Sequence, residues 1–357
     1  MSWYVIDAVD KAYGRAKKCL FEPFDFWKWM KLAIIVLLIG GSGGNFNGGG
    51  NSYSSDDYIF SDSGPVESFD EAFGGFIDQI FTDPNMGLVI GAIVFIFILA
   101  LFLAYVSNVM EFVFVESLVS NDVRFWEYSR KYLRKGLGLF VFRILVGIVL
   151  LAIIALMALP FVLPMIGSSG DFEEIMMSNI LTVISLLISV ILVTAIIGGI
   201  ISSFVNLSIP VAIYTESGIF RAFSNVLGQF RKEWKQIIVY WLGRIVLSII
   251  VGIIIGIILL VVMIVAGLFI LLVDGLIYFA LSAALAGSDT IIWMILVPII
   301  LIQIILFIFL LAFVGLPASV FMKYHMLTFL QQWYPDVEIP VFDMQMFAEE
   351  EESLMEA

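Results

Sequence analysis

Residues 237–273 read IIVYWLGRIVLSIIVGIIIGIILLVVMIVAGLFILLV, and Arg244 is the one charged residue among them. A helix needs about 20 mostly apolar residues to cross the hydrocarbon core of a bilayer. This run is longer than that, and a soluble protein could not cover so much apolar surface. The stretch therefore predicts a membrane-spanning helix, and the rest of the chain can be examined for others like it.

The composition of the whole chain points the same way. Of 357 residues, 61% are hydrophobic and 14% are charged, against roughly 45–50% and about 25% in soluble proteins. The net charge of −13 argues against a nucleic-acid partner, which needs a basic surface. Cys19 is the only cysteine, so an internal disulfide is excluded. His325 is the only histidine, so few residues could form a Cys/His metal site or a catalytic triad. We expect no cofactor.

Further apolar segments lie on both sides of the first. We predict an all-α fold, a polytopic transmembrane helix bundle of three outward-and-back helical hairpins plus interfacial amphipathic helices. The apolar stretch 275–286 is either a re-entrant or interfacial piece or a separate span. The six predicted spans are 24–40, 86–119, 137–166, 179–214, 237–273 and 291–325.

The remaining segments divide the chain into three parts. Residues 1–23 form an N-terminal cytoplasmic amphipathic helix, lying in the membrane interface or on the ends of other helices. Residues 24–326 are the six-helix membrane domain, whose outer loop 41–85 carries an amphipathic helix at 66–81. Residues 327–357 are an acidic cytoplasmic tail.

Lysine and arginine are confined to one side of this threading. Segments 41–85, 167–178 and 286–290 contain none of the 18 basic residues. Short loops rich in lysine and arginine stay in the cytoplasm. We therefore expect a multi-pass protein of the cell (plasma) membrane with its N- and C-termini cytoplasmic.

Two basic connections match at an offset of 101 residues. RKYLRKGLGLFVFRILVGI begins at Arg130, and RKEWKQIIVYWLGRIVLSI begins at Arg231. In each copy a basic turn leads into a span that carries one arginine about two turns inside, Arg143 and Arg244 respectively. This internal repeat predicts hairpins that all run in the same sense, unlike the inverted halves of many carriers.

The second copy also carries a family resemblance. SIPVAIYTESGIFRAFSNVLGQFRKEWKQIIVYWLGRIVL, from Ser208, resembles the membrane domain attached to some glycerophosphodiester phosphodiesterases. The opening, MSWYVIDAVDKAYGRAKKCL, is similar to that of uncharacterised archaeal six-helix membrane proteins. The resemblance implies a helix bundle at the cell membrane and no known reaction. We recognise no phosphodiesterase catalytic domain, so that activity is not carried over.

Four ionisable residues at membrane depth are functional candidates, because exposing charge to lipid is expensive. They are Glu111, Glu116, Arg143 and Arg244. We expect Glu111 to lie beside Arg143 or Arg244 as an ion pair. The cluster is a polar cavity for a lipid head group or small anion, a structural pair that fixes helix register, or a set of arginines that reach back to the interface.

Other residues suggest contacts rather than chemistry. Gly252 and Gly256 have the GxxxG spacing that lets two helices approach closely, within the bundle or in a homo-oligomer. The acidic tail is either a binding site for a protein partner or a solvated end. Candidate contacts for lipid head groups are Arg130, Lys131, Arg134, Arg231, Lys232 and Lys235.

These patterns support one function best. The chain has no paired catalytic set, which favours a non-enzymatic integral membrane protein that organises lipid or partner proteins at the cell membrane. The alternative is a transporter or channel for a small solute or lipid, using a polar site near Glu111, Arg143 and Arg244. A lipid-modifying enzyme is the weakest hypothesis, because neither a base nor a nucleophile is visible.

Overall fold

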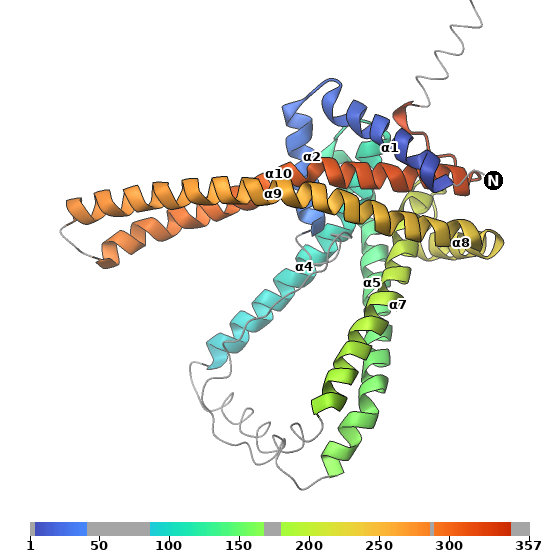
Figure 1. Ribbon diagram of the computed structural model, residues 1–357, viewed down its shortest axis with the longest axis horizontal. Coiled ribbons are helices and arrows are strands. Elements are labelled where there is room, and N and C mark those ends of the chain that lie inside the picture. Colours follow the sequence, from blue (N-terminus) through green and yellow to red (C-terminus); the bar gives the residue numbers. More distant parts are fainter. Residues whose placement is uncertain (1–3, 41–85, 168–179, 286–288, 344–357) are drawn as a thin grey trace, which may run out of the picture. The chain divides into compact units, whose positions relative to one another are not determined.

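The computed structural model describes residues 4–40, 86–167, 180–285 and 289–343, and these contain helices and no strand. The all-helical prediction is confirmed (Figure 1). The predicted outer helix at 66–81 lies outside the described residues. The helices are α1 (Tyr4–Phe21), α2 (Phe26–Gly40), α4 (Met86–Val119), α5 (Phe125–Gly167), α7 (Ile180–Tyr214), α8 (Ile219–Lys232), α9 (Trp234–Ala284) and α10 (Asp289–Trp333).

Five of these helices, α4, α5, α7, α9 and α10, are long and apolar enough to cross a membrane. They correspond to the predicted spans two to six. The first predicted span is α2, which has 15 residues and is shorter than the roughly 20 that a crossing usually needs. The composition of the described helices is that of a multi-pass membrane protein. The arrangement as three hairpins stays a prediction.

Two predicted boundaries differ from the structure. α9 continues without a break to Ala284, so residues 275–284 extend the fifth span instead of forming a separate or re-entrant piece. α10 continues to Trp333, and buried side chains follow as far as Asp343. The predicted tail therefore begins with a segment, 327–343, that packs against the rest of the protein. The remainder, 344–357, lies outside the described residues.

The chain divides into two compact units, each described by itself. Unit 1 comprises residues 1–49, 106–137 and 207–357, and unit 2 comprises residues 50–105 and 138–206. In unit 2 the apolar side chains of α4, α5 and α7 are mostly exposed, as in Ile93 to Ile98 and in Leu181. Such surfaces suit a hydrocarbon solvent.

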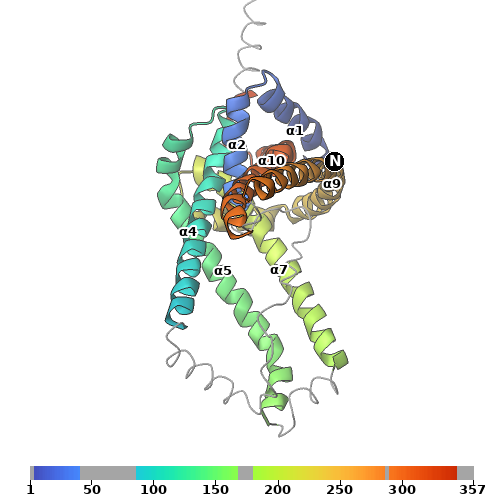
Figure 2. The same cartoon turned by 90° about the vertical axis from the view of Figure 1, so that its left-hand side faces the viewer.

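Unit 1 holds a buried core at the basic ends of the helices. α1 packs on α10 and α9, and α2 packs on α10. In Figure 2, which looks roughly along α9 and α10, the two N-terminal helices arch over them. The apolar side chains of α9 beyond Arg244 are largely exposed, whereas those at the end of α10 are fully buried.

Small residues let α1 lie close to its neighbours. Ala8, Ala12 and Ala16 are buried and recur every four residues, so they share one face of the helix. Ile6 and Tyr13 lie off this face and are 66% and 65% exposed. The helix is present as predicted, and it uses its small-residue face for packing inside the protein.

A close helix crossing fixes the start of α5 against α4. A Cβ atom on Gly136 would collide with the side chain of Val109 and lie 2.9 Å from its Cα. Backbone cannot give way as a flexible side chain can. The two helices can therefore approach this closely only because residue 136 is a glycine.

We predict that Gly136→Ala lowers the stability of the detergent-purified protein by about 1–3 kcal/mol, the cost of overpacking. Gly14→Ala is the matched control, because a Cβ atom at Gly14 meets nothing within 4 Å. There the alanine should be neutral or slightly stabilising, as helix propensity favours it. Thermal unfolding would measure both, and equal midpoints would contradict the close crossing.

Candidate functional site

A buried arginine joins the two ends of the described chain. Arg15 on α1 donates from Nε to Oδ2 of Asp343 at 2.6 Å. Its Nη1 donates to Oγ1 of Thr328 at 2.8 Å and to Oε1 of Gln331 at 2.9 Å. Arg15 and Asp343 are only 7% and 8% exposed. We call these four residues the Arg15 clamp.

The Arg15 clamp pairs charge with several hydrogen bonds because burying an isolated guanidinium would be expensive. The planar guanidinium has donors in a fixed fork, which suits one carboxylate plus neighbouring oxygen acceptors. The exposed pair between Lys17 of α1 and Glu22, just past the helix end, is different: both side chains are about half exposed, and the Glu22 carboxylate raises the pKa of Lys17. Only the buried pair can hold the chain ends together strongly.

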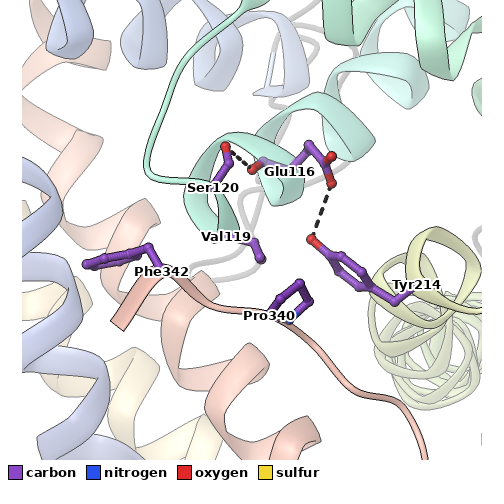
Figure 3. Close-up of a pocket in the computed structure, with 6 residues that line it drawn as sticks. All are labelled: Glu116, Val119, Ser120, Tyr214, Pro340 and Phe342. Carbon is purple, nitrogen blue, oxygen red and sulfur yellow. Dashed lines mark hydrogen bonds between the residues drawn. The ribbon is translucent and has the colours of Figure 1, made fainter. Parts of the chain in front are cut away.

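The segment that the Arg15 clamp fixes also lines a cavity of about 280 Å³. Figure 3 shows its lining from the end of α4, the end of α7 and the C-terminal segment. The neighbouring Tyr324 ring lies 6.3 Å from the Phe342 ring, and its hydroxyl donates to the carbonyl oxygen of Leu118. The lining residues are Glu116, Val119, Ser120, Tyr214, Pro340 and Phe342.

Glu116 is the charged group of this cavity. Lys131 Nζ donates to its Oε1 at 2.9 Å, and the Tyr214 hydroxyl donates to its Oε2 at 3.2 Å. The side chain of Glu116 is 15% exposed and that of Lys131 is 55% exposed, so the pair lies at the edge of the core. The ammonium and the phenol together hold the carboxylate in one orientation.

Among the other predicted intramembrane residues, Arg244 lies beside an aromatic ring. Arg244 donates from Nη1 to the Tyr240 hydroxyl at 2.5 Å, and the Tyr240 ring stacks on Phe329 with centroids 4.1 Å apart. Glu111 is 2% exposed on α4 in unit 1, whereas Arg143 belongs to unit 2. The predicted pairing of Glu111 with an arginine stays a prediction.

The candidate head-group residues fall into two groups. Lys131 is turned toward Glu116, and the nearby Lys135 donates to the carbonyl oxygen of Ala212 at 2.7 Å. The other five candidates lie on the exposed surface and form no ion pair with any described residue. They are Arg130, Arg134, Arg231, Lys232 and Lys235.

The cavity carries groups that can bind a ligand. The cavity offers one paired carboxylate and two hydroxyls, those of Ser120 and Tyr214. Within the described residues no group of three His, Cys, Asp or Glu side chains could hold a metal ion. The arrangement orients polar groups and ties helix ends together.

Comparison with known proteins gives a family. A family model described as a family of unknown function, DUF7544, matches residues 3–340. The chain belongs to the DUF7544 family. The match includes α1, all five long helices and the start of the Pro340–Phe342 segment. No curated protein and no solved structure matched this chain.

The Arg15 clamp was not predicted from the sequence. Arg15 and Asp343 lie 328 residues apart, and nothing in the local pattern of either one names the other. A usable signal was present on α1 alone, because Arg15 falls on the same face as Ala8, Ala12 and Cys19. A charged residue on a face of small residues indicates a buried partner.

We predict that Arg15→Ala destabilises the protein by about 3–5 kcal/mol, because Asp343 then keeps a buried charge without its partner. Lys17→Ala on the same helix should leave the denaturation midpoint unchanged, since its pair with Glu22 is exposed. Chemical denaturation in detergent, with limited proteolysis of the C-terminal segment, measures both. Similar losses in the two variants would refute the clamp.

We predict that Glu116→Gln and Tyr214→Phe are non-additive by about 1 kcal/mol, because both remove the same charge-assisted hydrogen bond. A double-mutant cycle of unfolding free energies measures this. Lys131→Gln should cost less than Tyr214→Phe, since the Lys131 ammonium is largely solvated. Strictly additive losses would mean that the carboxylate and the phenol do not interact in solution.

Proposed function

We propose that this protein is a non-enzymatic integral membrane protein that organises lipid or partner proteins at the plasma membrane, with both termini in the cytoplasm. The observation that carries the proposal is the Arg15 clamp. It ties α1, the end of α10 and the C-terminal segment into one buried polar cluster at the basic ends of the helices. A firmly tied cap suits a platform more than a part that must open and close.

The distribution of charge supports the cytoplasmic placement of this cap. All 18 basic residues lie on or near its side of the predicted threading, and the opposite loops contain none. The cytoplasmic leaflet carries anionic lipids, which attract such residues at about 1 kcal/mol each. The interfacial role of α1 belongs to the same proposal, because Ile6 and Tyr13 leave an exposed apolar edge beside its packed face.

The internal repeat finds support in burial. Residues 133–139 and 234–240 have the same order of exposed, intermediate and buried positions at the offset of 101. Gly136 and Leu139 are buried in the first copy, as are Ile237 and Tyr240 in the second. The matching burial supports repeated hairpins.

One observation favours the alternative of a transporter or channel. Glu111 is buried at 2% exposure in a helix long and apolar enough to span a membrane. Ionisable groups at such depth often mark solute or proton paths. In this alternative Glu111, Arg143 and Arg244 would line the path, and charge removal at any of them would abolish flux.

Two partner proposals accompany the main one. The acidic end 344–357 would bind a basic protein partner. Gly252 and Gly256 would let a second copy pack against α9, and a Cβ atom at Gly256 would meet nothing within 4 Å. Deleting 344–357 is the proper test of the first, because a deletion from Leu327 would also remove buried core.

Cysteine labelling tests the topology. Cys19 is buried, so a Cys19→Ala background allows one new thiol at a time. We predict that an impermeant maleimide labels Ser54→Cys in intact cells and labels Ser224→Cys, on exposed α8, only after permeabilisation. The reverse result would overturn the cytoplasmic cap.

Reconstitution then separates the two functions. Proteoliposomes loaded with a pH-sensitive dye, and others carrying a fluorescent phospholipid, should show no protein-dependent proton leak or lipid scrambling if the protein is a platform. Flux that disappears in Glu111→Gln and Arg244→Gln, but persists in Lys17→Gln, would favour the transporter.

A further inference from the structure

The basic turn that opens α5 exposes a regular stripe of side chains. Arg130, Leu133, Arg134 and Leu137 are exposed and spaced by three or four residues, so they lie on one helical face. Leu133 and Leu137 are 46% and 50% exposed. We call these four residues the first stripe. Basic and apolar side chains alternate along it.

The second copy of the repeat exposes the equivalent stripe. Arg231, Trp234, Lys235 and Ile238 correspond to the first stripe at the offset of 101, and all four are exposed. Trp234 is 50% exposed, and Lys235 lies over its indole ring at 6.0 Å from the centroid. We call these the second stripe. Arg231 lies in the last turn of α8, and the other three residues lie at the start of α9. The two copies thus keep the same alternation of basic and apolar side chains, which the first copy carries on one continuous helix.

The four basic side chains of the stripes are available for a ligand. None of them forms an ion pair with another residue in the described ranges. Lys131 and Lys135, which directly follow Arg130 and Arg134, are instead bonded to Glu116 and to the backbone of Ala212. In the first copy, therefore, Lys131 and Lys135 make contacts within the protein, whereas Arg130 and Arg134 are exposed on the surface.

We propose that the two stripes are equivalent binding sites for anionic phospholipids. The guanidinium or ammonium groups bind the head-group phosphate, and the apolar residues one turn further along the helix contact the upper acyl chains. Arginine suits phosphate because its donors form a fixed fork, and tryptophan suits the boundary between head groups and hydrocarbon. This proposal rests on the proposed function in one respect only: the proposed topology places both stripes at the cytoplasmic leaflet.

The alternation argues for a lipid over other anions. A soluble phosphate would use the charges alone and gain nothing from Leu133, Leu137 or Ile238. An acidic protein partner would need acidic and apolar groups arranged to fit both stripes. A phospholipid matches each stripe by itself, because it carries its negative charge and its apolar chains at adjacent depths.

The test uses the full-length protein in neutral detergent micelles containing fluorescent phosphatidylglycerol or phosphatidylcholine. The wild type should prefer phosphatidylglycerol. Removing a basic residue near such a head group should weaken binding about fivefold, so Arg130→Gln/Arg134→Gln and Arg231→Gln/Lys235→Gln should each weaken one site about 25-fold. The variant that carries all four substitutions should lose the preference for phosphatidylglycerol.

The matched control is Lys17→Gln/Arg124→Gln, which removes two exposed basic residues already paired with acids. It should keep the full preference, and unchanged unfolding midpoints show that each variant is folded. The proposal is overturned if the stripe variants keep the preference, if the control loses it equally, or if glycerol phosphate or poly-glutamate displaces the lipid at similar concentrations. If the cysteine labelling is reversed but the preference for phosphatidylglycerol persists, the cytoplasmic placement is wrong and the two stripes are still lipid-binding sites.

Discussion

The buried pair of Arg15 and Asp343 is the interaction on which unit 1 depends. Each charge would be costly to bury alone, and each finds its partner only when α1 is seated on α10 and the C-terminal segment is folded back. The two ends of the described chain are therefore coupled energetically. The cavity beside Glu116 follows from that coupling, since Phe342 is the immediate neighbour of Asp343 and forms part of its lining.

The structure separates two kinds of apolar surface. At the basic ends of the helices, apolar side chains are buried by other protein, as with Leu32, Phe112 and Phe329. Further along the long helices they are largely exposed, and in α4 every residue from 91 to 103 is exposed. Lipid does not drive helices together as water does, so packing in the spans can remain loose while the cap is dense. The cap supplies the specific contacts that the spans do not need.

The sequence predicted those features that are set locally. Pro23 predicts the break between α1 and α2, and the structure has it, with the Asp25 carboxylate accepting from the backbone amide of Trp27 at 2.8 Å. Apolar runs predicted every long helix, because hydropathy acts residue by residue. The fifth span was predicted to end at residue 273, but α9 continues through Asp274 and Gly275 to Ala284. An isolated glycine inside a helix costs only about 1 kcal/mol, so it does not end the helix.

Contacts between distant segments were harder to predict. Glu116 was identified as a candidate from its depth, but its partners Lys131 and Tyr214 come from two other helices. Polarity after Leu327 suggested a tail, although Val337, Ile339 and Val341 alternate as they would on a packed extended segment and are buried. Local polarity indicates which segments can be exposed to water. Which polar groups form hydrogen bonds with one another depends on the tertiary fold.

The spacing of charges along α9 bears on what its arginine does. Beyond Lys235, α9 carries only Arg244 and Asp274 as charged residues. Thirty residues of helix rise about 45 Å, which equals the thickness of a bilayer with its head groups, about 40–45 Å. Arg244 and Asp274 can therefore occupy the two head-group regions at once, with nothing charged between them. An arginine placed there, bonded to Tyr240, is satisfied without a transport path, and this favours the platform over the transporter.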